Sequence, residues 1–198
     1  MQKFNFPGDI HFVTFKTYNN HHFFKDESCC ELFLRILNNL RDKLKFDVLG
    51  YCILLEHIHL LLHLWVAANS FAARNRATNE FVVTQKEEDI SYVIKRIKGM
   101  SASEINQYFS RQGSHALPER SQGAGALATP RRRIKIWQSS FYDFNIYSLK
   151  KFNEKLNYIH KNPIKHGLVD DVSKYKYCSW RNYELNDHSV FKIDFLEF

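Results

Sequence analysis

The sequence predicts an α+β fold, because segments with strand and helix patterns follow one another in a characteristic order. Short runs of apolar, β-branched and aromatic residues indicate strands, whereas apolar residues spaced three and four apart indicate amphipathic helices. Along the chain these patterns have the order β–α–β–β–α–β, and one more helix follows the last strand. We therefore expect a ferredoxin-like split βαβ sandwich with an antiparallel sheet and an added C-terminal helix.

The first strand and the first helix are predicted from local composition. Residues 10–17 are rich in β-branched and aromatic side chains, which favour strands. Ser28 and Glu31 have the S-x-x-E spacing of a capping box, so the helix is expected to begin at Ser28. An apolar stripe then continues at helical spacing, and the helix should end near Lys45.

The second and third strands are predicted within one nearly continuous apolar stretch. Residues 47–55 and 57–66 are the two strands, and the connection at Glu56 is expected to be a hairpin or a very tight turn. Residues 67–84 lose the apolar period, so they are expected to form a loop.

The second helix is expected to begin near Asp89 and to be interrupted in its middle. Gly99 can end or bend a helix, and a second capping box that begins at Ser101 predicts a restart through about Phe109. Residues 111–133 combine Gly, Ser and Pro without an apolar period, which predicts a mobile loop.

The last strand is expected over residues 134–144, and the third helix after it. Ser148 is the expected N-cap, and Pro163 the expected end, because proline lacks the N–H that continues a helix. The expected buried side of this helix consists of Leu149, Phe152, Leu156 and Ile159. Residues 170–198 are aromatic and basic, and we expect them to cover the body of the protein.

Length and composition indicate one domain over residues 1–198 with a nucleic-acid partner. The chain has 44% apolar residues but no run of 18 apolar residues free of charge, so no membrane helix is expected. No secretory signal is expected at the N-terminus, and the four cysteines have no paired spacing, which favours reduced thiols in the cytoplasm. A net charge of +7 with 15% aromatic residues suits a partner with phosphates and bases.

Two histidines in the third strand are candidate metal ligands. His57 and His59 stand two residues apart, so on a strand they point to the same face about 7 Å apart along the backbone. Two imidazoles at that spacing can converge on one ion, although an isolated pair of this kind is more often structural. His63 shares the face, but we interpret it as a structural residue.

The third helix carries a tyrosine away from its apolar stripe. Tyr158 lies two residues after Leu156, about 200° round a helix of 3.6 residues per turn, so it should leave the buried side. Asn162 follows one turn later on the same face. Tyr158 has no evident packing function, which makes it a candidate for a reactive site. Tyr142 is a rival nucleophile, for which aromatic packing is the preferred interpretation.

Basic side chains form clusters that are candidates for phosphate contacts. They are Lys95, Arg96 and Lys98 on the second helix, Arg131, Arg132 and Arg133 at the end of the loop, and Lys165 after the third helix. Such clusters are commonly no more than solvated surface, so they carry weight only together with the other motifs.

Three blocks of the sequence resemble the HUH-class single-tyrosine transposases and, among them, the REP-associated tyrosine transposases. The first block is His57-Ile-His59, and the second is Trp-Gln-Ser-Ser-Phe-Tyr-Asp over residues 137–143. The third, over residues 158–169, matches the family pattern Y-I-x-x-N-P-x-K-x-G. The blocks occur in the family order. One departure is Leu55, where relatives often have proline before the histidine pair.

The resemblance implies a metal-dependent enzyme that cleaves and rejoins single-stranded or hairpin DNA. His57 and His59 would hold Mg²⁺ or Mn²⁺, and Asn162 stands where the class places a third ligand. Tyr158 would form a 5′-phosphotyrosine, which makes the added C-terminal helix the catalytic helix. The resemblance leaves open whether the protein acts as a monomer or a homodimer, and no membrane partner is expected.

Two other functions remain open from the sequence. The same scaffold could bind structured single-stranded DNA without cleaving it, but the presence of Tyr158 beside both histidines favours the enzyme. A zinc hydrolase with His57, His59 and His63 as ligands is more remote, since it would need neither the tyrosine nor the DNA.

Overall fold

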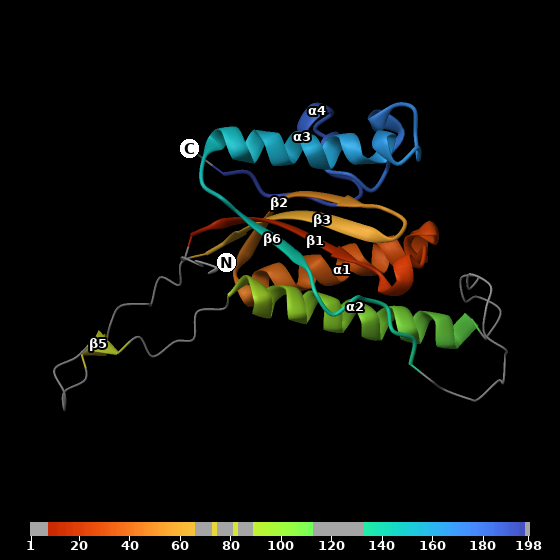
Figure 1. Cartoon of the computed structure of the whole chain (residues 1–198), viewed down its shortest axis with the longest axis horizontal. Helices are drawn as coiled ribbons and strands as arrows, with labels where there is room; N and C mark the ends of the chain where they lie inside the picture. Colours follow the sequence, from red (N-terminus) through yellow and green to blue (C-terminus); the bar gives the residue numbers. More distant parts are fainter. Residues whose placement is uncertain (1–7, 66–72, 75–80, 83–88, 113–132, 197–198) are drawn as a thin grey trace.

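The computed structural model describes residues 8–65, 73–74, 81–82, 89–112 and 133–196. Its centre is an antiparallel sheet with the strand order β2-β3-β1-β6. The strands are β1 (Ile10–Lys16), β2 (Phe46–Ile53), β3 (His57–Leu64) and β6 (Tyr142–Ile146). This order is that of a split βαβ sandwich, so the predicted fold class is confirmed (Figure 1).

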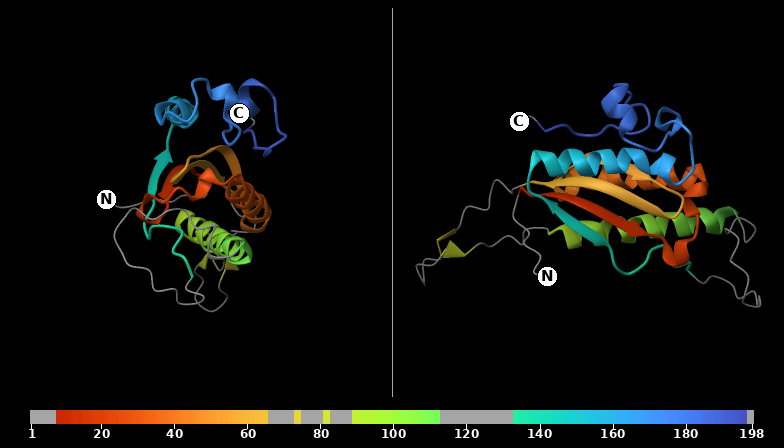
Figure 2. Two further views of the ribbon diagram at one scale, coloured as in Figure 1. Left: turned by 90° about the vertical axis from the view of Figure 1, so that its right-hand side faces the viewer. Right: turned by 45° about the horizontal axis from the view of Figure 1, so that its top comes forward.

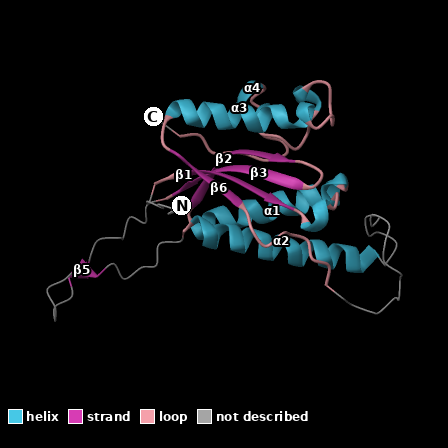
Figure 3. Cartoon of the chain, in the orientation of Figure 1, coloured by secondary structure: helices cyan, strands magenta, loops and turns pink. Residues whose placement is uncertain are grey.

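Long helices cover both faces of the sheet. Helices α1 (Glu27–Leu44) and α2 (Ile90–Gln112) lie side by side against one face, and α3 (Leu149–Lys165) crosses the other (Figures 1 and 2). The remaining elements, all short, are η1 (Tyr18–Asn20), η2 (Phe23–Lys25), β4 (Ala73–Arg74), β5 (Phe81–Val82), η4 (Val172–Lys174) and α4 (Trp180–Glu184) (Figure 3). No helix in the described part of the chain is both long enough and apolar enough to cross a membrane.

Alternation along β3 divides the core into two clusters. Ile58, Leu60 and Leu62 point towards α1 and α2 and belong to the larger cluster, as expected from the sequence. Leu61 points the other way and belongs to the smaller cluster beneath α3. Because side chains alternate along a strand, His57 and His59 share the face of Leu61 and therefore lie under α3.

Helix α3 approaches the sheet closely at a bulge in β2. The register of β2 on β3 shifts between Val48 and Gly50. A Cβ atom added to Gly50 would lie 3.0 Å from Leu156 Cδ1, so glycine allows the helix to pack at this distance. Phe152 and Ile159 are buried as predicted, but the prediction for Leu149 is wrong, since this first residue of the helix is exposed beyond the edge of the sheet.

One predicted end of helix α1 is corrected and the other is confirmed. Helix α1 is capped by Asp26, whose carboxylate accepts a hydrogen bond from Ser28 N at 2.9 Å, so the predicted capping box at Ser28 is wrong. Aspartate is as good an N-cap as serine, and here it stands two residues earlier. The predicted C-terminus is confirmed, with Lys45 as the C-cap.

The predicted break in the second helix is wrong, because α2 is continuous. Ser101 is buried and its hydroxyl donates to Ile97 O at 2.7 Å within the helix, so it does not cap a new helix. Gly99 costs such a helix about 1 kcal/mol relative to alanine. Burial of Ile97 and Ile105 on either side of the glycine offsets that cost.

The last strand begins later than predicted. Trp137 makes a single bridge to Thr17, and regular pairing with β1 starts only at Tyr142. Between them the chain turns away from the sheet, and Lys98 Nζ donates to the carbonyl oxygens of residues 138, 139 and 140 at 2.6, 3.2 and 3.2 Å. These carbonyls are therefore satisfied by a side chain instead of by a neighbouring strand.

Helix α3 ends in a Schellman motif two residues later than predicted. Pro163 lies inside its last turn, and the helix continues to Lys165. Leu168 N donates to Pro163 O and Gly167 N donates to Ile164 O, both at 2.9 Å. Gly167 has φ +65°, which glycine adopts without strain. This turn fixes the position of His166 at the end of the helix.

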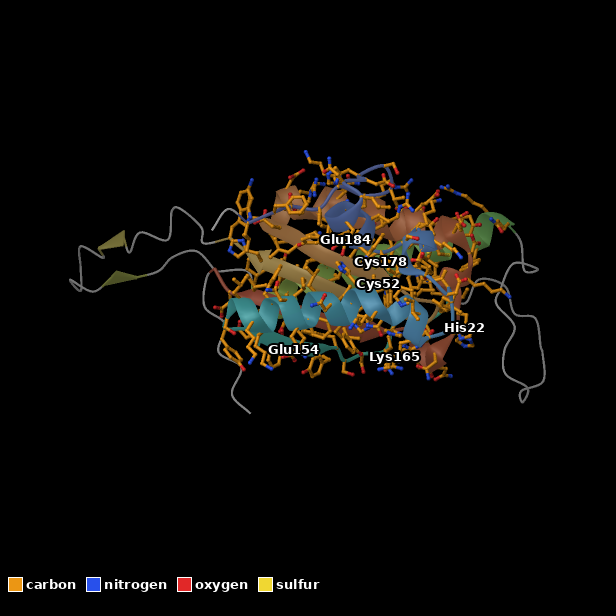
Figure 4. The ribbon with its side chains drawn as sticks, turned by 90° about the horizontal axis from the view of Figure 1, so that it is seen from above. His22, Cys52, Glu154, Lys165, Cys178 and Glu184 are labelled. Carbon is orange, nitrogen blue, oxygen red and sulfur yellow. The ribbon has the colours of Figure 1, made fainter. Side chains whose placement is uncertain are left out.

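The C-terminal segment closes the outer edge of β2. Ile53 N donates to Tyr177 O at 3.0 Å, Ser179 N donates to Tyr51 O at 2.9 Å, and Asp194 N donates to Val48 O at 2.9 Å. Cys52 and Cys178 lie opposite each other in this pairing (Figure 4). The predicted loop over residues 111–133 lies outside the described residues, except that Arg111 and Gln112 belong to α2 and Arg133 is described.

Candidate active site

The two histidines of the HUH motif lie side by side at the start of β3. His57 is 5% exposed and His59 is 2% exposed. Their ring centroids are 4.8 Å apart and the rings are nearly perpendicular, at 83°. Phe12 of the neighbouring strand stacks on His59 at 5.6 Å between centroids. The pair is therefore a packed, rigid feature of the sheet.

Each histidine is oriented by a hydrogen bond to its Nδ1. His57 Nδ1 lies 2.9 Å from Glu56 Oε1, and His59 Nδ1 lies 2.7 Å from Thr14 Oγ1. Glu56 lies in the turn of the hairpin, and Thr14 stands opposite His59 in the register of β1 on β3. Anchoring one ring nitrogen in this way is how metal-binding histidines are usually held, with Nε2 left for the ligand.

Burial keeps both imidazoles neutral. It lowers the pKa of His59 to about 3, with the neighbouring His57 as the next cause. It also lowers the pKa of His57, although Glu56 acts in the opposite direction. A neutral imidazole is the form that binds a metal ion. In addition, His59 Nε2 is buried and has no hydrogen-bond partner among the described residues, which is costly unless a ligand satisfies it.

Tyr158 lies against this pair. Its ring centroid is 5.3 Å from that of His59, and the two rings are tilted by 75°. The side chain is 40% exposed, so it leaves the apolar stripe of α3 as the periodicity predicted. Lys165 Nζ lies 5.5 Å from the centre of the tyrosine ring. A phenol, an ammonium group and two neutral imidazoles thus meet at one end of the sheet.

Asn162 lies on the same side of α3 but is buried. It is 0% exposed, which corrects the expectation that it is turned away from the body together with Tyr158. Its Nδ2 donates to Tyr158 O at 2.7 Å, and its Oδ1 is buried without a partner among the described residues. The turn of α3 that contains Asn162 crosses the end of β3 where the histidines lie, so the sheet buries the Asn162 side chain. Within the described part of the chain, its amide oxygen is therefore buried but still free to accept a bond.

His166 belongs to the same cluster, although it was not predicted to be a site residue. Its ring centroid is 5.0 Å from that of His57. It stands one turn after Asn162 and two turns after Tyr158, so all three share one helix face. That spacing is the signal from which it could have been found. The antiparallel crossing of α3 over β3 brings His166 to His57 and Tyr158 to His59.

The zinc site considered from the sequence is not formed. In the ranges that the structure describes, no three His, Cys, Asp or Glu side chains form a group that could hold a metal ion. His63 Nδ1 instead lies 2.9 Å from Asp47 Oδ2 on the neighbouring strand. The candidate donors at this end of the sheet are the imidazoles of His57 and His59 and the Asn162 amide oxygen, with the His166 ring beside His57.

The basic residues are distributed over both faces of the sheet. Lys165 lies near Tyr158 on the α3 side (Figure 4), whereas Lys95 and Arg96 are exposed on α2, on the opposite side (Figure 1). Lys98 is occupied by the three carbonyl oxygens described above, and burial lowers its pKa. We therefore interpret Lys98 as a structural residue. It lines a cavity of about 620 Å³ between α2 and residues 133–141. Arg133 lines the same cavity, and Arg131 and Arg132 lie outside the described residues.

Comparison with known proteins finds similar sequences and a similar fold. The chain is 28% identical over 135 residues to a protein of Haemophilus influenzae described as a REP-associated tyrosine transposase. It is 25% identical over 119 residues to a REP-associated tyrosine transposase of Escherichia coli K12. The solved structure of a REP-associated tyrosine transposase bound to a REP hairpin superposes with a TM-score of 0.63, covering 100% of this chain and 91% of that one.

The predicted resemblance to REP-associated tyrosine transposases is confirmed. The matched region is 68% of this chain and 59% of the Haemophilus influenzae protein, so the chain spans less than two thirds of that relative. The region matched to the Escherichia coli protein is 54% of this chain and 71% of that protein. With 16% identity, the superposed structure bears on the fold alone. No family model matches the chain.

The three sequence blocks that resemble REP-associated tyrosine transposases meet in space. The histidine block forms the start of β3, and the tyrosine block forms the second half of α3 above it. In the block between them, Trp137 packs under the sheet against Phe15 at 4.9 Å between centroids, and Tyr142 begins β6. Segments separated by up to about a hundred residues therefore build one end of the molecule.

Proposed function

We propose that the protein is a metal-dependent endonuclease and strand transferase that acts on hairpin-forming single-stranded DNA. The observation that carries the proposal is the contact of Tyr158 with the buried, neutral His59. A half-exposed tyrosine beside an unsatisfied imidazole nitrogen suits nucleophilic attack on a phosphate better than it suits packing. The relatives named transposases, and the superposed transposase structure with a bound REP hairpin, support DNA as the substrate.

His57, His59 and Asn162 fit a divalent cation. The two imidazoles are neutral and oriented, and both His59 Nε2 and Asn162 Oδ1 are buried without another partner among the described residues. A mixed set of imidazole nitrogens and one amide oxygen suits Mn²⁺ better than Mg²⁺, which prefers oxygen ligands. Bound there, the ion would polarise the scissile phosphate and offset charge that develops on it.

Tyr158 carries the covalent step. Its phenolic oxygen would form a bond to phosphorus, and the bond from phosphorus to the 3′-oxygen of the preceding nucleotide would break. The phenolic proton leaves to solvent, which reaches the half-exposed side chain, and the departing oxygen takes up a proton to become a 3′-hydroxyl. The Lys165 ammonium lies 5.5 Å from the centre of the ring, where it would contact the reacting phosphate.

The second step reverses the first with another strand. A 3′-hydroxyl attacks the phosphotyrosine, a phosphodiester forms, and Tyr158 is released. Two exchanges of equivalent bonds need no nucleotide cofactor. His166 and Lys165 would contact the phosphate from the end of α3, which holds the His166 ring beside His57.

The test is a search for the covalent protein–DNA adduct on a denaturing gel. The DNA is a hairpin from repeats that flank the gene, labelled at its 3′ end, with Mn²⁺ present. A 5′-phosphotyrosine leaves the label on the protein, so the wild-type chain should give a labelled protein band and Tyr158→Phe should give none.

The matched control is Tyr92→Phe, since Tyr92 is 41% exposed on α2. This variant should keep the adduct. Survival of the adduct in Tyr158→Phe, together with its loss in Tyr142→Phe, would assign the nucleophile to Tyr142 instead. Binding of the hairpin by the wild-type chain with no adduct at all would identify a DNA-binding protein without catalysis.

A further inference from the structure

Exposed tyrosines line the sheet edge next to the candidate active site. Tyr142 begins β6 and is 53% exposed, and Tyr147 follows the end of β6 and is 73% exposed. Both precede α3 in the chain, and β6 is the last strand of the sheet on this side. Folding does not bury these rings, although burying an aromatic side chain is usually favourable.

Tyr142 lies in the same cross-strand row as the histidine pair. It stands opposite Thr14, which in turn stands opposite His59 and hydrogen-bonds to it. With about 4.8 Å between neighbouring strands, the backbones of Tyr142 and His59 are roughly 10 Å apart. Phe12 lies between them under the surface, 6.1 Å from Tyr142 and 5.8 Å from Tyr158 between ring centroids. A base bound on Tyr142 would therefore adjoin a phosphate at Tyr158.

A second line of aromatic side chains runs along β6 from Tyr142 through Phe144 to Tyr147. Phe144 is half-buried between the two tyrosines, with its ring centroid 6.1 Å from that of Tyr147. Lys155 Nζ lies over Phe144 at 4.7 Å and over Phe12 at 5.1 Å. The ammonium is thus held at the surface of the aromatic row, where it can meet a phosphate while its stem packs on the rings.

Lysines stand among the exposed rings along this edge. Lys150 is exposed at the start of α3, and Lys155 and Lys165 stand on either side of Tyr158 along the helix. Alternating cations and exposed rings are what a flexible single strand requires, because every base has a face that stacks and every linkage carries a phosphate. A protein partner would have no need for this alternation.

We propose that Tyr142 and Tyr147 form a stacking platform for unpaired bases in the strand that carries the scissile phosphate. The platform deepens the proposed function and rests on it for the position of the reacting phosphate. It requires that the DNA be single-stranded beside the cleavage position, since paired bases present no free face. Its preference for sequence would be weak, because stacking reads no hydrogen-bonding groups.

The test compares the binding of two DNA molecules by the whole chain. EDTA is present to remove divalent metal ions, so that binding is measured without cleavage. One is a hairpin with single-stranded extensions that contain 2-aminopurine, and the other is the same hairpin with blunt ends. Tyr142→Ala and Tyr147→Ala should each weaken binding of the extended hairpin about tenfold, the effect of losing one base–aromatic stack. Binding of the blunt hairpin should stay unchanged.

Tyr142→Phe keeps the ring, so it should bind the extended hairpin as the wild type does and should quench 2-aminopurine equally. Tyr92→Ala, on the other side of the sheet, is the control for loss of an exposed tyrosine. Unchanged affinity of both platform variants, or an equal loss on the blunt hairpin, would overturn the platform. The adduct assay is independent: an adduct without any platform effect retains the proposed function, and a platform effect without an adduct retains the platform alone.

Discussion

Both faces of the sheet carry a buried histidine held through Nδ1 by a neighbouring carboxylate. On the α1/α2 face, His11 lies 2.9 Å from Asp143. On the α3 face, His57 lies 2.9 Å from Glu56. His11 and His59 also each have a buried Nε2 without a partner among the described residues. Judged by burial and orientation alone, the two sites are nearly equivalent.

Their surroundings differ. Around His57 stand a second imidazole, the exposed Tyr158 and the cationic end of α3. On the α1/α2 face the groups that look reactive are used by the fold: Lys98 binds backbone carbonyls, and the Trp137 indole donates to Ser101 Oγ at 3.0 Å. A buried histidine is thus weak evidence for a site, and an exposed nucleophile beside it is the stronger evidence.

The largest expected effect separates the two histidine sites. His57→Ala should lower the yield of covalent adduct at least about 100-fold, because it removes a proposed metal ligand. It should change affinity for the hairpin by no more than about twofold, since phosphate contacts by lysine and arginine supply most of the binding. Adduct formation and fluorescence anisotropy on the same preparation measure both quantities.

His11→Ala is the matched variant on the other face. It should lower the free energy of unfolding by about 2 kcal/mol through loss of a buried hydrogen bond and of packing, and leave the adduct yield of the folded protein unchanged. Persistence of cleavage in His57→Ala, or its loss in folded His11→Ala, would remove the distinction between the faces.

The second prediction uses pH and metal-free protein. Burial lowers the pKa of His59 to about 3 and of His160 to about 4, from an ordinary value of 6.5. Between those values the unfolded chain binds protons that the folded chain does not, so stability is fully present above pH 6.5 and is lost as pH falls below it. At pH 5 the loss should be roughly 2 kcal/mol for each histidine.

Urea denaturation at pH 7 and pH 5 measures this loss. His59→Gln, compared with its own stability at pH 7, should lose about half as much as the wild type on acidification. An identical loss in the variant and the wild type would show that His59 does not become charged on unfolding in this range.

The smallest expected effect compares two lysines. Lys165→Ala should reduce the slope of log affinity against log salt by about 0.7, the contribution of one phosphate contact in single-stranded DNA. Lys95→Ala tests the α2 face in the same way. Lys98→Ala should leave the slope unchanged and lower the free energy of unfolding by about 1–3 kcal/mol, because three carbonyl oxygens lose their donor. A smaller slope of log affinity against log salt in Lys98→Ala would show that Lys98 contacts DNA phosphate.

The fold could be predicted from the sequence wherever burial on one face decides an element. The strands before and after Glu56 and the apolar stripe of α3 are of this kind. Lys98 delays the start of β6 because it binds carbonyl oxygens distant from it in sequence, and local patterns do not encode such a pairing. The error at Ser101 is of another kind, because its hydroxyl bonds to Ile97 O within one continuous helix, where the pattern predicted a cap.

In the candidate site, too, local periodicity predicted the residues that it alone positions, and not those that depend on how two elements cross. His57, His59 and Tyr158 were predicted because strand and helix periods are rigid enough to say which way a side chain points. His166 was missed because its approach to His57 depends on how α3 crosses β3, which the close packing at Gly50 decides. Asn162 was placed on the correct side of the helix, but its burial depends on the same crossing.

The two edges of the sheet have unequal capacity for self-association. The C-terminal segment occupies the hydrogen-bonding groups of β2, so within the described part of the chain that edge offers no template for strand addition. Any sheet continued across two copies of the protein would have to run through β6. Such a dimer would cover Tyr142 and crowd the end of α3, so edge-to-edge assembly and occupation of this edge by a DNA strand are mutually exclusive.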